Sequence, residues 1–198
     1  MFVTFEGVDG SGKTTQVRLL AEQLRAEGRD VVETREPGGT AVGEQIRELI
    51  LGGDALAAWA EAALFAAARA QLVADVIRPA LARDADLVCD RYIDSSLAYQ
   101  GLARGLGVDR GLDFNLHSTG GLLPDRTFLL VVPLEEAERR RGSESDRIER
   151  EGSDFAADVD RAYRELAAIF AQRIIVVDGT QAPEDLSQLI RGQLRDLS

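Results

Sequence analysis

Hydrophobic and polar positions alternate along the chain in two kinds of segment, which predict strands and helices in regular succession. Short runs rich in β-branched and aromatic residues are typical of buried strands. They occupy residues 2–5, 30–34, 86–90, 126–132 and 173–177. The segments between them have the three-to-four-residue spacing of helices. This succession predicts an α/β fold of three layers, in which a five-stranded parallel sheet is flanked by helices.

Three helical segments have definable ends. The first covers residues 13–27, because apolar residues recur on one face and Gly28 supplies a stop. An Ala-rich segment predicts a long helix over residues 56–81, with Pro79 kinking or fraying its last turn. A closing helix is predicted over residues 183–197. Because parallel strands place ligands at their carboxyl ends, we expect any site to lie there.

One stretch departs from this pattern. Residues 135–151 form a run of Arg, Glu and Ser, which we interpret as a mobile loop flanked by helices. The remainder predicts a single domain over residues 1–198, since the length suits one compact core.

Charge and cysteine content narrow the class of protein. The net charge of −11 argues against a broad basic surface for nucleic acid, although arginines can still gather around a small anion. Cys89 is the only cysteine, so neither an intramolecular disulfide nor a thiolate zinc cluster can form, and a cytoplasmic location is expected. The sequence shows neither a signal peptide nor an apolar run long enough to span a membrane.

The strongest motif follows the first predicted strand. The pattern GxxxxGK[ST] is met by Gly7, Gly12, Lys13 and Thr14, with a strand before it and a helix after it. Such a P-loop closes backbone N–H groups around phosphates at a helix N-terminus. It predicts a P-loop NTPase-type fold that binds ATP and Mg²⁺, with Lys13 on the β- and γ-phosphates and Thr14 on the metal. The expected nucleotide-binding residues are Gly7, Val8, Asp9, Gly10, Ser11, Gly12, Lys13, Thr14 and Thr15.

A phosphate cradle alone does not separate kinases from switch or motor ATPases. Three stretches together are more specific: FEGVDGSGKTT at residues 5–15, TREPGGT at residues 34–40 and DRYIDSSLAYQG at residues 90–101. In order and spacing they resemble the bacterial thymidylate kinase family, and the resemblance extends essentially end to end. It implies an ATP-dependent kinase that converts dTMP to dTDP in dTTP synthesis. It also implies a homodimer, for which the Ala-rich helix offers an apolar face, although the same face would equally fit the core of one chain.

The resemblance assigns roles around the reacting phosphates. Asp90 would lie near Mg²⁺ together with Thr14, and Arg91 would hold the acceptor phosphate, for which a guanidinium fork is suited. Asp9 would contact the sugar 3′-hydroxyl or a metal-bound water. Arg35 and Glu36 would bring a second cation and an acid to the acceptor. A salt bridge at a strand end would explain Asp90 and Arg91 without any such role.

The resemblance also assigns the base pocket. Phe65 would stack on thymine, Arg69 would reach its O4 edge, and Ser96 with Gln100 would contact the polar edge of the ring. Tyr99 would lie where a 2′-hydroxyl projects, which favours deoxyribose. The full expected substrate set is Asp9, Arg35, Glu36, Pro37, Arg47, Phe65, Arg69, Arg91, Ser95, Ser96, Tyr99 and Gln100. Taken alone, Phe65 would fit a plain core position and Arg69 a solvated one.

The resemblance also implies a lid at about residues 139–153, carried by the cluster Arg139, Arg140, Arg141, Arg147 and Arg150. The P-loop itself has no arginine in its variable positions. Transition-state charge must then be met by an arginine from elsewhere. Arg141 and Arg147 are our candidates, and with Lys13, Arg91 and Asp9 they complete the predicted catalytic set. A solvated helix face with local ion pairs would explain the same residues.

The predicted reaction needs no general base. A phosphate monoester has a second pKa of about 6 and is largely the dianion at neutral pH. Positioning and charge neutralisation then carry the reaction, and the single His117 has no required role. Two alternatives stay open: a related nucleoside-monophosphate or deoxynucleoside kinase with another acceptor, and a nucleotide-dependent switch protein.

Overall fold

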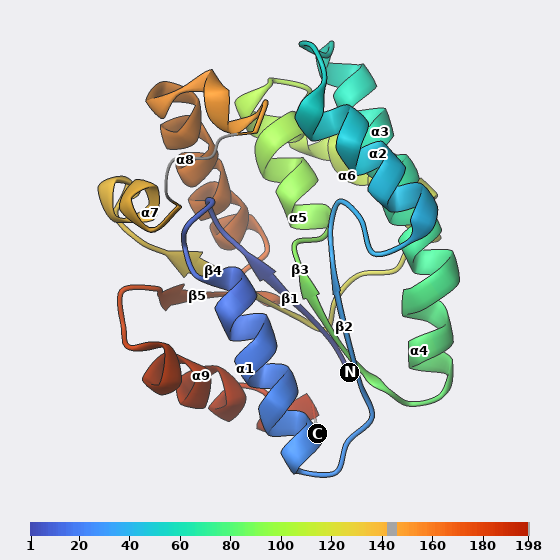
Figure 1. Cartoon of the computed structure of the whole chain (residues 1–198), viewed down its shortest axis with the longest axis vertical. Helices are drawn as coiled ribbons and strands as arrows, with labels where there is room; N and C mark the ends of the chain where they lie inside the picture. The colour runs from blue at the N-terminus through green and yellow to red at the C-terminus, as the bar shows by residue number, and fades with distance from the viewer. Residues whose placement is uncertain (142–145, 198) are drawn as a thin grey trace.

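Five parallel strands form one central sheet in the order β2-β3-β1-β4-β5 (Figure 1). The structure, a computed structural model, describes residues 1–141 and 146–197. The strands are β1 Phe2–Glu6, β2 Val31–Arg35, β3 Asp86–Asp90, β4 Arg126–Val131 and β5 Ile174–Asp178. Each begins and ends within one residue of its predicted bounds. The predicted α/β fold with a five-stranded parallel sheet is confirmed.

Helices α1 (Lys13–Ala26) and α9 (Pro183–Gly192) cover one face of the sheet (Figure 1). The apolar stripe of α1 packs with Val3 and Phe5 of β1, whose side chains are fully buried. Helix α1 begins where the sequence predicted and ends one residue early, with Gly28 at φ +84° beyond it. The predicted closing helix is shorter than expected, because α9 ends at Gly192 and a 3₁₀ turn, η4 (Arg195–Leu197), follows.

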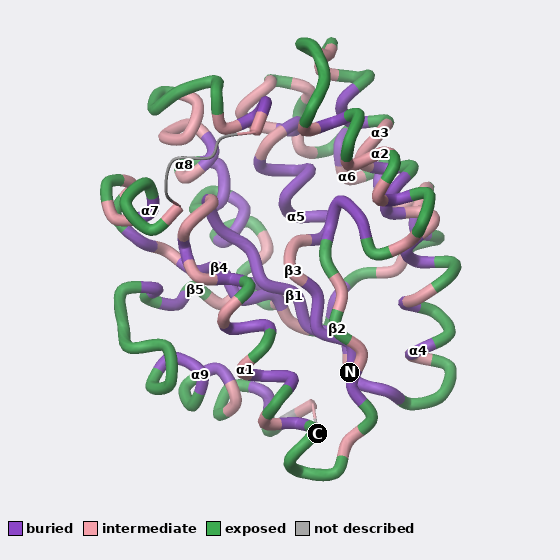
Figure 2. Tube along the Cα trace, in the orientation of Figure 1, coloured by how far each residue is buried: buried purple, intermediate pink, exposed green. Residues whose placement is uncertain are grey.

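The opposite face is covered by more elements. They are α5 (Ile93–Ser96), η2 (Leu97–Ala103), α6 (Val108–Thr119), α8 (Ser153–Ile169) and the end of the long helical segment described next. Helix α8 packs Val159, Ala162 and Leu166 into the core with Leu129 of β4. In Figure 2 the central strands β1, β3 and β4 are buried along most of their length, while the edge strands β2 and β5 are partly exposed and the outer helical turns are exposed. This is the three-layer arrangement that the hydrophobic pattern predicts.

The Ala-rich segment forms a helix with a change of geometry near its end. Helix α3 (Ala58–Leu72) continues into a π-helical turn, η1 (Val73–Ile77), and then into the short α4 (Arg78–Ala82). The wider turn lies just before Pro79, which has no N–H to donate to the preceding turn. Helix α2 (Ala41–Gly52) packs beside α3. The expected disturbance at Pro79 therefore takes the form of a π turn.

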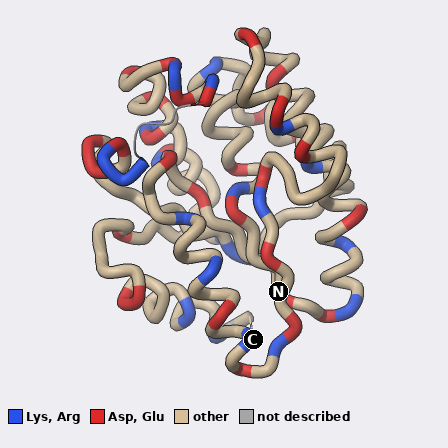
Figure 3. Tube along the Cα trace, in the orientation of Figure 1, with Lys and Arg blue, Asp and Glu red and all other residues tan. Residues whose placement is uncertain are grey.

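The prediction of a loop over residues 135–151 is wrong for its first half. Helix α7 covers Leu134–Arg141, and a 3₁₀ turn, η3, covers Glu149–Glu151. Glu136 pairs with Arg139 at 2.7 Å and with Arg140 at 2.6 Å, and these pairs favour helix. Acidic residues begin α7 and basic residues end it, in line with the helix dipole (Figure 3). Residues 142–145 of the expected lid lie outside the described residues.

None of the described helices is both long and apolar enough to cross a membrane.

Candidate active site

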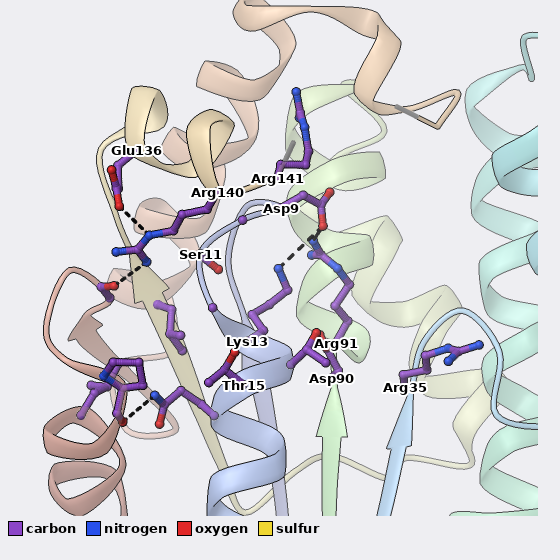
Figure 4. Close-up of a pocket in the computed structure, with 18 of the residues that line it drawn as sticks. Asp9, Ser11, Lys13, Thr15, Arg35, Asp90, Arg91, Glu136, Arg140 and Arg141 are labelled. Carbon is purple, nitrogen blue, oxygen red and sulfur yellow. Dashed lines mark hydrogen bonds and ion pairs between the residues drawn. The ribbon is translucent and has the colours of Figure 1, made fainter. Parts of the chain in front are cut away.

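The carboxyl ends of three neighbouring strands bring the three sequence motifs together. In the register of the sheet, Asp90 at the end of β3 lies beside Phe5 of β1 and Arg35 of β2. Backbone hydrogen bonds continue past the strands, from Arg91 N–H to the Phe5 carbonyl and from Glu36 N–H to the Asp90 carbonyl, each 2.9 Å. A cavity of about 740 Å³ lies over this edge (Figure 4). We call it the phosphate cavity.

The loop between β1 and α1 forms one wall of the phosphate cavity and has no space for a side chain at Gly7 or Gly10. Gly7 has φ +137°, and a Cβ there would lie 2.5 Å from the Leu130 carbonyl oxygen. Gly10 has φ +84°, and a Cβ would lie 2.0 Å from the Ala137 carbonyl oxygen of α7. Lys13 Nζ donates to the Val8 carbonyl at 2.9 Å, which closes the loop. The loop is thus a tight backbone cradle at the N-terminus of α1.

The pKa values of two charged residues in the loop, Asp9 and Lys13, are shifted far from their ordinary values. Burial, with the nearby Arg91 guanidinium, lowers the pKa of Lys13 to about 8. Burial would raise the pKa of Asp9, but Arg91 and Lys13 outweigh it and hold that pKa well below its usual value. Lys13 Nζ lies 3.8 Å from Asp9 Oδ1. The cavity therefore contains a fixed anion beside two cations, and a bound phosphate would restore the full charge of the lysine.

Thr14 and Asp90, which the resemblance places near a metal ion, lie side by side in the phosphate cavity. Thr14 Oγ1 donates to Asp90 Oδ2 at 2.5 Å. Both are hard oxygen ligands, and Mg²⁺ in nucleotide sites takes one or two such protein ligands and completes its shell with phosphates and water. Among the described residues, no group of three or more His, Cys, Asp and Glu could hold a metal ion on its own. The oxygen pair fits Mg²⁺ that arrives with a nucleotide.

Arg91 has an unusual backbone and a crowded side chain. Its φ of +70° is rare for a residue with a Cβ and is typical of functional sites. Its guanidinium donates to Asp9 at 2.6 Å, to Tyr163 at 2.9 Å and to Ser95 at 3.1 Å, and lies 5.5 Å from the ring centre of Tyr99. The fork is therefore held in one position before any substrate binds.

Glu6, which our sequence reasoning missed, binds two of the residues that hold Arg91. Its fully buried carboxylate accepts hydrogen bonds from the Tyr92 N–H at 2.8 Å, from Ser95 Oγ at 2.6 Å and from the Tyr163 hydroxyl at 2.9 Å. Burial raises the pKa of Glu6 to about 7. The last residue of β1 thus fixes two of the groups that hold Arg91. Its position directly before the first glycine of the motif was the available signal.

A smaller cavity of about 80 Å³ adjoins the phosphate cavity and contains most of the predicted substrate residues. We call it the acceptor cavity. Its lining includes Asp9, Glu36, Pro37, Arg47, Phe65, Arg91, Ser95, Ser96, Tyr99 and Gln100, together with Leu51, Asp146 and Ile148. Asp9, Glu36, Arg47 and Arg91 line both cavities. A group bound in one cavity therefore lies next to a group bound in the other.

Arg69 does not line the acceptor cavity, contrary to its expected contact with a base edge. Its side chain is fully buried and donates to Glu36 at 2.7 Å, to Ser96 Oγ at 3.0 Å and to Asn115 Oδ1. In this arrangement it lies behind the pocket wall and holds Glu36 and Ser96 in place. Burial raises the pKa of Glu36, although Arg69 opposes the shift. Asn115, on α6, was absent from our predictions and lies too far along the chain to be paired with Arg69 by spacing.

Arg35, Pro37 and Arg47 border the cavities from the β2 side. Arg35 is more than half exposed and donates to both carboxylate oxygens of Glu44 at 3.1 Å. Arg47 Nη1 donates to the Pro37 carbonyl at 2.9 Å. In Figure 4 Arg35 lies across the cavity from Lys13. Arg35 lines the phosphate cavity but not the acceptor cavity, where its cation was expected, whereas Pro37 and Arg47 line the acceptor cavity.

The two candidate lid arginines differ in placement. Arg141 lines the phosphate cavity, but its side chain extends away from Lys13 (Figure 4), and its Nε lies 3.8 Å from Glu149 Oε1. Arg147 is buried against α2 and α3, where it donates to the Ile50 carbonyl at 2.7 Å and to Glu61 at 2.5 Å. The structure therefore does not bring Arg147 to the phosphate cavity. Arg140, which binds the Gly179 carbonyl at 2.9 Å, does line it.

The far end of the phosphate cavity was also missed. It is lined by Gln16, Gly179, Gln181, Pro183 and Leu186. Gln16 Nε2 donates to the Pro183 carbonyl at 2.9 Å, which joins α1 to the segment after β5. The glycine and proline that follow β5 marked a turn in the sequence, but only the sheet order places that turn beside the phosphate loop.

Comparisons with known proteins agree on one family. A family model described as thymidylate kinase matches residues 5–190. A thymidylate kinase of Bifidobacterium longum (strain DJO10A) is 46% identical over 203 residues, covering 100% of this chain and 98% of the relative. One of Pelotomaculum thermopropionicum is 50% identical over 187 residues, covering 91% of this chain and 86% of the relative. The crystal structure of thymidylate kinase from Ehrlichia chaffeensis superposes with a TM-score of 0.79 at 32% identity, covering 98% of each chain.

Proposed function

Because this chain belongs to the thymidylate kinase family, we infer that it transfers the γ-phosphoryl group of ATP to dTMP, giving dTDP and ADP. The observation that carries the assignment of residues below is the pair of adjoining cavities with a common wall. Asp9, Glu36, Arg47 and Arg91 line both of them. A donor phosphate in one cavity and an acceptor phosphate in the other would therefore lie next to each other at this boundary.

The proposed donor site is the phosphate cavity. The backbone of residues 7–15 would hold the β- and γ-phosphates, with Lys13 neutralising the charge that develops on them. The fit is supported by the tight glycine turns and by the buried amine of Lys13. Residues 179–183 would border the nucleoside end of ATP, at the far end of the same cavity.

Thr14 and Asp90 are the residues that would hold Mg²⁺. The metal supplies charge neutralisation to the donor phosphates when it is bound. The chain's own contribution is to keep two oxygen ligands together beside the loop, as the Thr14 to Asp90 hydrogen bond of 2.5 Å does.

Arg91 is proposed to hold the acceptor phosphate in line with the donor. Its fixed guanidinium would offset the repulsion between two anions. The acceptor is already a dianion at neutral pH, so no proton has to be removed. His117 fits this reading, since its side chain is exposed on α6 and lines neither cavity. Asp9, which pairs with Arg91, would hold its guanidinium at the boundary between the two cavities.

The acceptor cavity is proposed to hold the nucleoside of dTMP. Phe65 would stack on the base, and Ser96 and Gln100 would contact its polar edge. Tyr99 packs against Phe155 and Tyr163, and this rigid packing supports a role in excluding a 2′-hydroxyl. Arg69 would not contact the base but would hold Glu36 and Ser96 in place through its hydrogen bonds.

Arg141 is the arginine that we propose to neutralise transition-state charge from the lid at about residues 139–153. It lines the phosphate cavity, and its Nε has no hydrogen-bond partner among the described residues. Arg147 is the weaker candidate, because it is bound to Glu61.

We also propose a homodimer of single-domain chains acting in the cytoplasm. Ala60, Ala63 and Ala67 form an exposed stripe on α3 next to the half-exposed Trp59, as expected for a helix that packs on another copy. The single, buried thiol of Cys89 suits a reducing compartment. Sedimentation equilibrium of wild type and of Ala63→Arg tests the dimer; one protomer mass for both would exclude it.

One assay tests the proposed function. Purified protein with ATP and Mg²⁺ is offered dTMP, dUMP, UMP, CMP, AMP or thymidine, and ADP release is followed. Selective release with dTMP is expected. Selective release with another nucleotide would instead identify a related nucleoside-monophosphate kinase, and release that does not depend on the acceptor would indicate a switch or ATPase.

A further inference from the structure

Glu61 on α3 is a buried carboxylate with an unusual number of donors, and the proposed reaction gives it no role. It accepts from Gln100 Nε2 at 2.7 Å, from Arg104 Nε at 2.6 Å and from Arg147 Nη2 at 2.5 Å. Its side chain is fully buried. Burial would raise the pKa of Glu61, but these hydrogen bonds outweigh it and hold that pKa below its usual value. The group is therefore an anion at neutral pH.

An ionised carboxylate can only accept hydrogen bonds, and this fixes how Gln100 is turned. The group of Gln100 that faces Glu61 must be the NH₂ group, since two acceptor oxygens would repel each other at that distance. The orientation of this amide follows from chemistry and does not depend on how the two ends were assigned. Its carbonyl oxygen, Oε1, is consequently directed away from Glu61.

Gln100 lines the acceptor cavity, and its Oε1 has no hydrogen-bond partner among residues 1–141 and 146–197. The cavity wall therefore presents an acceptor at this position. Thymine and uracil carry an N–H at ring position 3, whereas cytosine carries a lone pair there. A site built to accept from an N–H rejects an analogue that lacks it, because a polar group is then left unpaired.

We propose that Glu61 is a positioning residue that sets base specificity: it holds the Gln100 amide so that Oε1 accepts a hydrogen bond from ring N3–H of the bound pyrimidine. This rests on the proposed function, in which the acceptor cavity holds a nucleoside. Arg104 and Arg147 complete the device, since they occupy the other lone pairs of Glu61 and keep it charged. Gln100 would thus contact the base, and Glu61, which lies behind Gln100, would determine which group Gln100 presents to it.

The substitution Glu61→Gln makes a distinctive prediction. Oε2 of Glu61 accepts from Nη2 of both arginines, so the amide oxygen of the new side chain would take this position. Its NH₂ group would then replace Oε1 and face Gln100, while Arg104 Nε would lose its acceptor. Gln100 would then turn over, because only its oxygen can accept from that NH₂ group, and would present a donor to the cavity. The cavity would now favour a base with a lone pair at position 3.

The experiment measures kcat/KM for dTMP and for 5-methyl-2′-deoxycytidine monophosphate, with ADP release as the signal. In Glu61→Gln we expect the ratio of the two values to fall by about 10- to 100-fold relative to wild type. The matched control is Glu151→Gln, which removes another acid bound to Arg104 and Arg147 but not to Gln100. Its ratio should equal that of wild type.

The outcomes separate the possibilities. A purely structural role for Glu61 would lower both kcat/KM values together and leave their ratio unchanged, which would overturn the proposal. Should Glu61→Gln fail to fold, Gln100→Met removes the acceptor and leaves the arginine pairs intact; its ratio should also fall, and a ratio kept at the wild-type value would overturn the proposal. Wild type that does not use dTMP would refute the proposed function instead.

Discussion

Asp9 in the phosphate loop and Arg91 at the end of β3 are joined by a hydrogen bond of 2.6 Å between Oδ1 and Nη2. The pair connects the proposed donor side to the acceptor side before either substrate arrives. Because Arg91 also binds Ser95 and Tyr163, its guanidinium has little freedom left. Preorganisation of this kind favours a transition state over a flexible ground state.

Removing the charge of Asp9 should loosen this connection. In Asp9→Asn we expect kcat for dTMP to fall by about 10- to 100-fold, because Arg91 loses its charged partner and is no longer held firmly at the boundary between the two cavities. Steady-state kinetics with both substrates varied measures this. An unchanged kcat would show that Ser95 and Tyr163 alone hold the arginine.

Removing the guanidinium itself should cost more. Arg91→Ala is expected to lower kcat/KM for dTMP by about 10³-fold or more, since the repulsion between the two phosphates is then not offset. Arg164→Ala is a suitable control, because Arg164 forms an exposed ion pair with Asp160 on α8. Near-normal phosphorylation of dTMP by Arg91→Ala would remove this residue from the proposed mechanism.

The lowered pKa of Lys13, about 8, predicts how nucleotide binding depends on pH. In the free protein the amine loses its proton as the pH rises through 8, whereas a bound phosphate favours the charged form. Binding of ADP should therefore take up protons near pH 9, and its affinity should fall as the pH rises above 8. Calorimetry in buffers of different ionisation enthalpy measures the uptake. Lys13→Arg, which stays charged, should show none; uptake by both proteins would point to another group.

The contact between Gly10 and α7 predicts a loss of stability on adding one methyl group. A Cβ at Gly10 would lie 2.0 Å from the Ala137 carbonyl oxygen, so Gly10→Ala must displace α7 or the loop. We expect a loss of about 2 to 4 kcal/mol, from the left-handed backbone and from overpacking. The KM for ATP should also rise. Gly28 has the same φ of +84° but nothing within 4 Å, so Gly28→Ala should cost only the backbone part, about 1 kcal/mol. Thermal unfolding compares the two, and equal losses would exclude the clash.

Glu6 predicts a pH dependence of stability. Its pKa in the folded protein, about 7, lies above the ordinary value of 4.5. Between these values the folded state binds more protons than the unfolded state, so Glu6 makes the free energy of unfolding decrease as the pH rises from about 4.5 to 7. In Glu6→Gln this contribution is absent, and the stability should change less over that range. Urea unfolding at pH 5, 6, 7 and 8 tests the difference; parallel pH curves would contradict it.

The sequence predicted best the parts of the site that are local. The phosphate loop is a continuous stretch whose glycines, lysine and threonine dictate their own geometry, and Asp90 and Arg91 follow directly from the end of a buried strand. Sheet order then brings these stretches together without further information.

Contacts between distant elements were the part that could not be predicted. Arg69 binds Asn115 and Glu36 and so lies behind the pocket, and nothing in the spacing of these residues pairs them. Arg147 was expected over the phosphates because it lies in an arginine-rich run, but the burial of Glu61 provides a competing anion. Helix α7 was not predicted because the run of Arg, Glu and Ser over residues 135–151 was interpreted as a loop, whereas its i, i+3 and i, i+4 ion pairs favour helix.

The phosphate-binding groups and the base-binding groups of the proposed site come from two different kinds of element. The groups proposed to handle phosphates stand at the ends of β1 and β3, rooted in backbone hydrogen bonds. The walls of the acceptor cavity that would face a base come largely from α3 and η2. The acceptor specificity of this scaffold could therefore be changed by substitutions on helices alone, while the residues at the strand ends that are proposed to bind the phosphates stay unchanged.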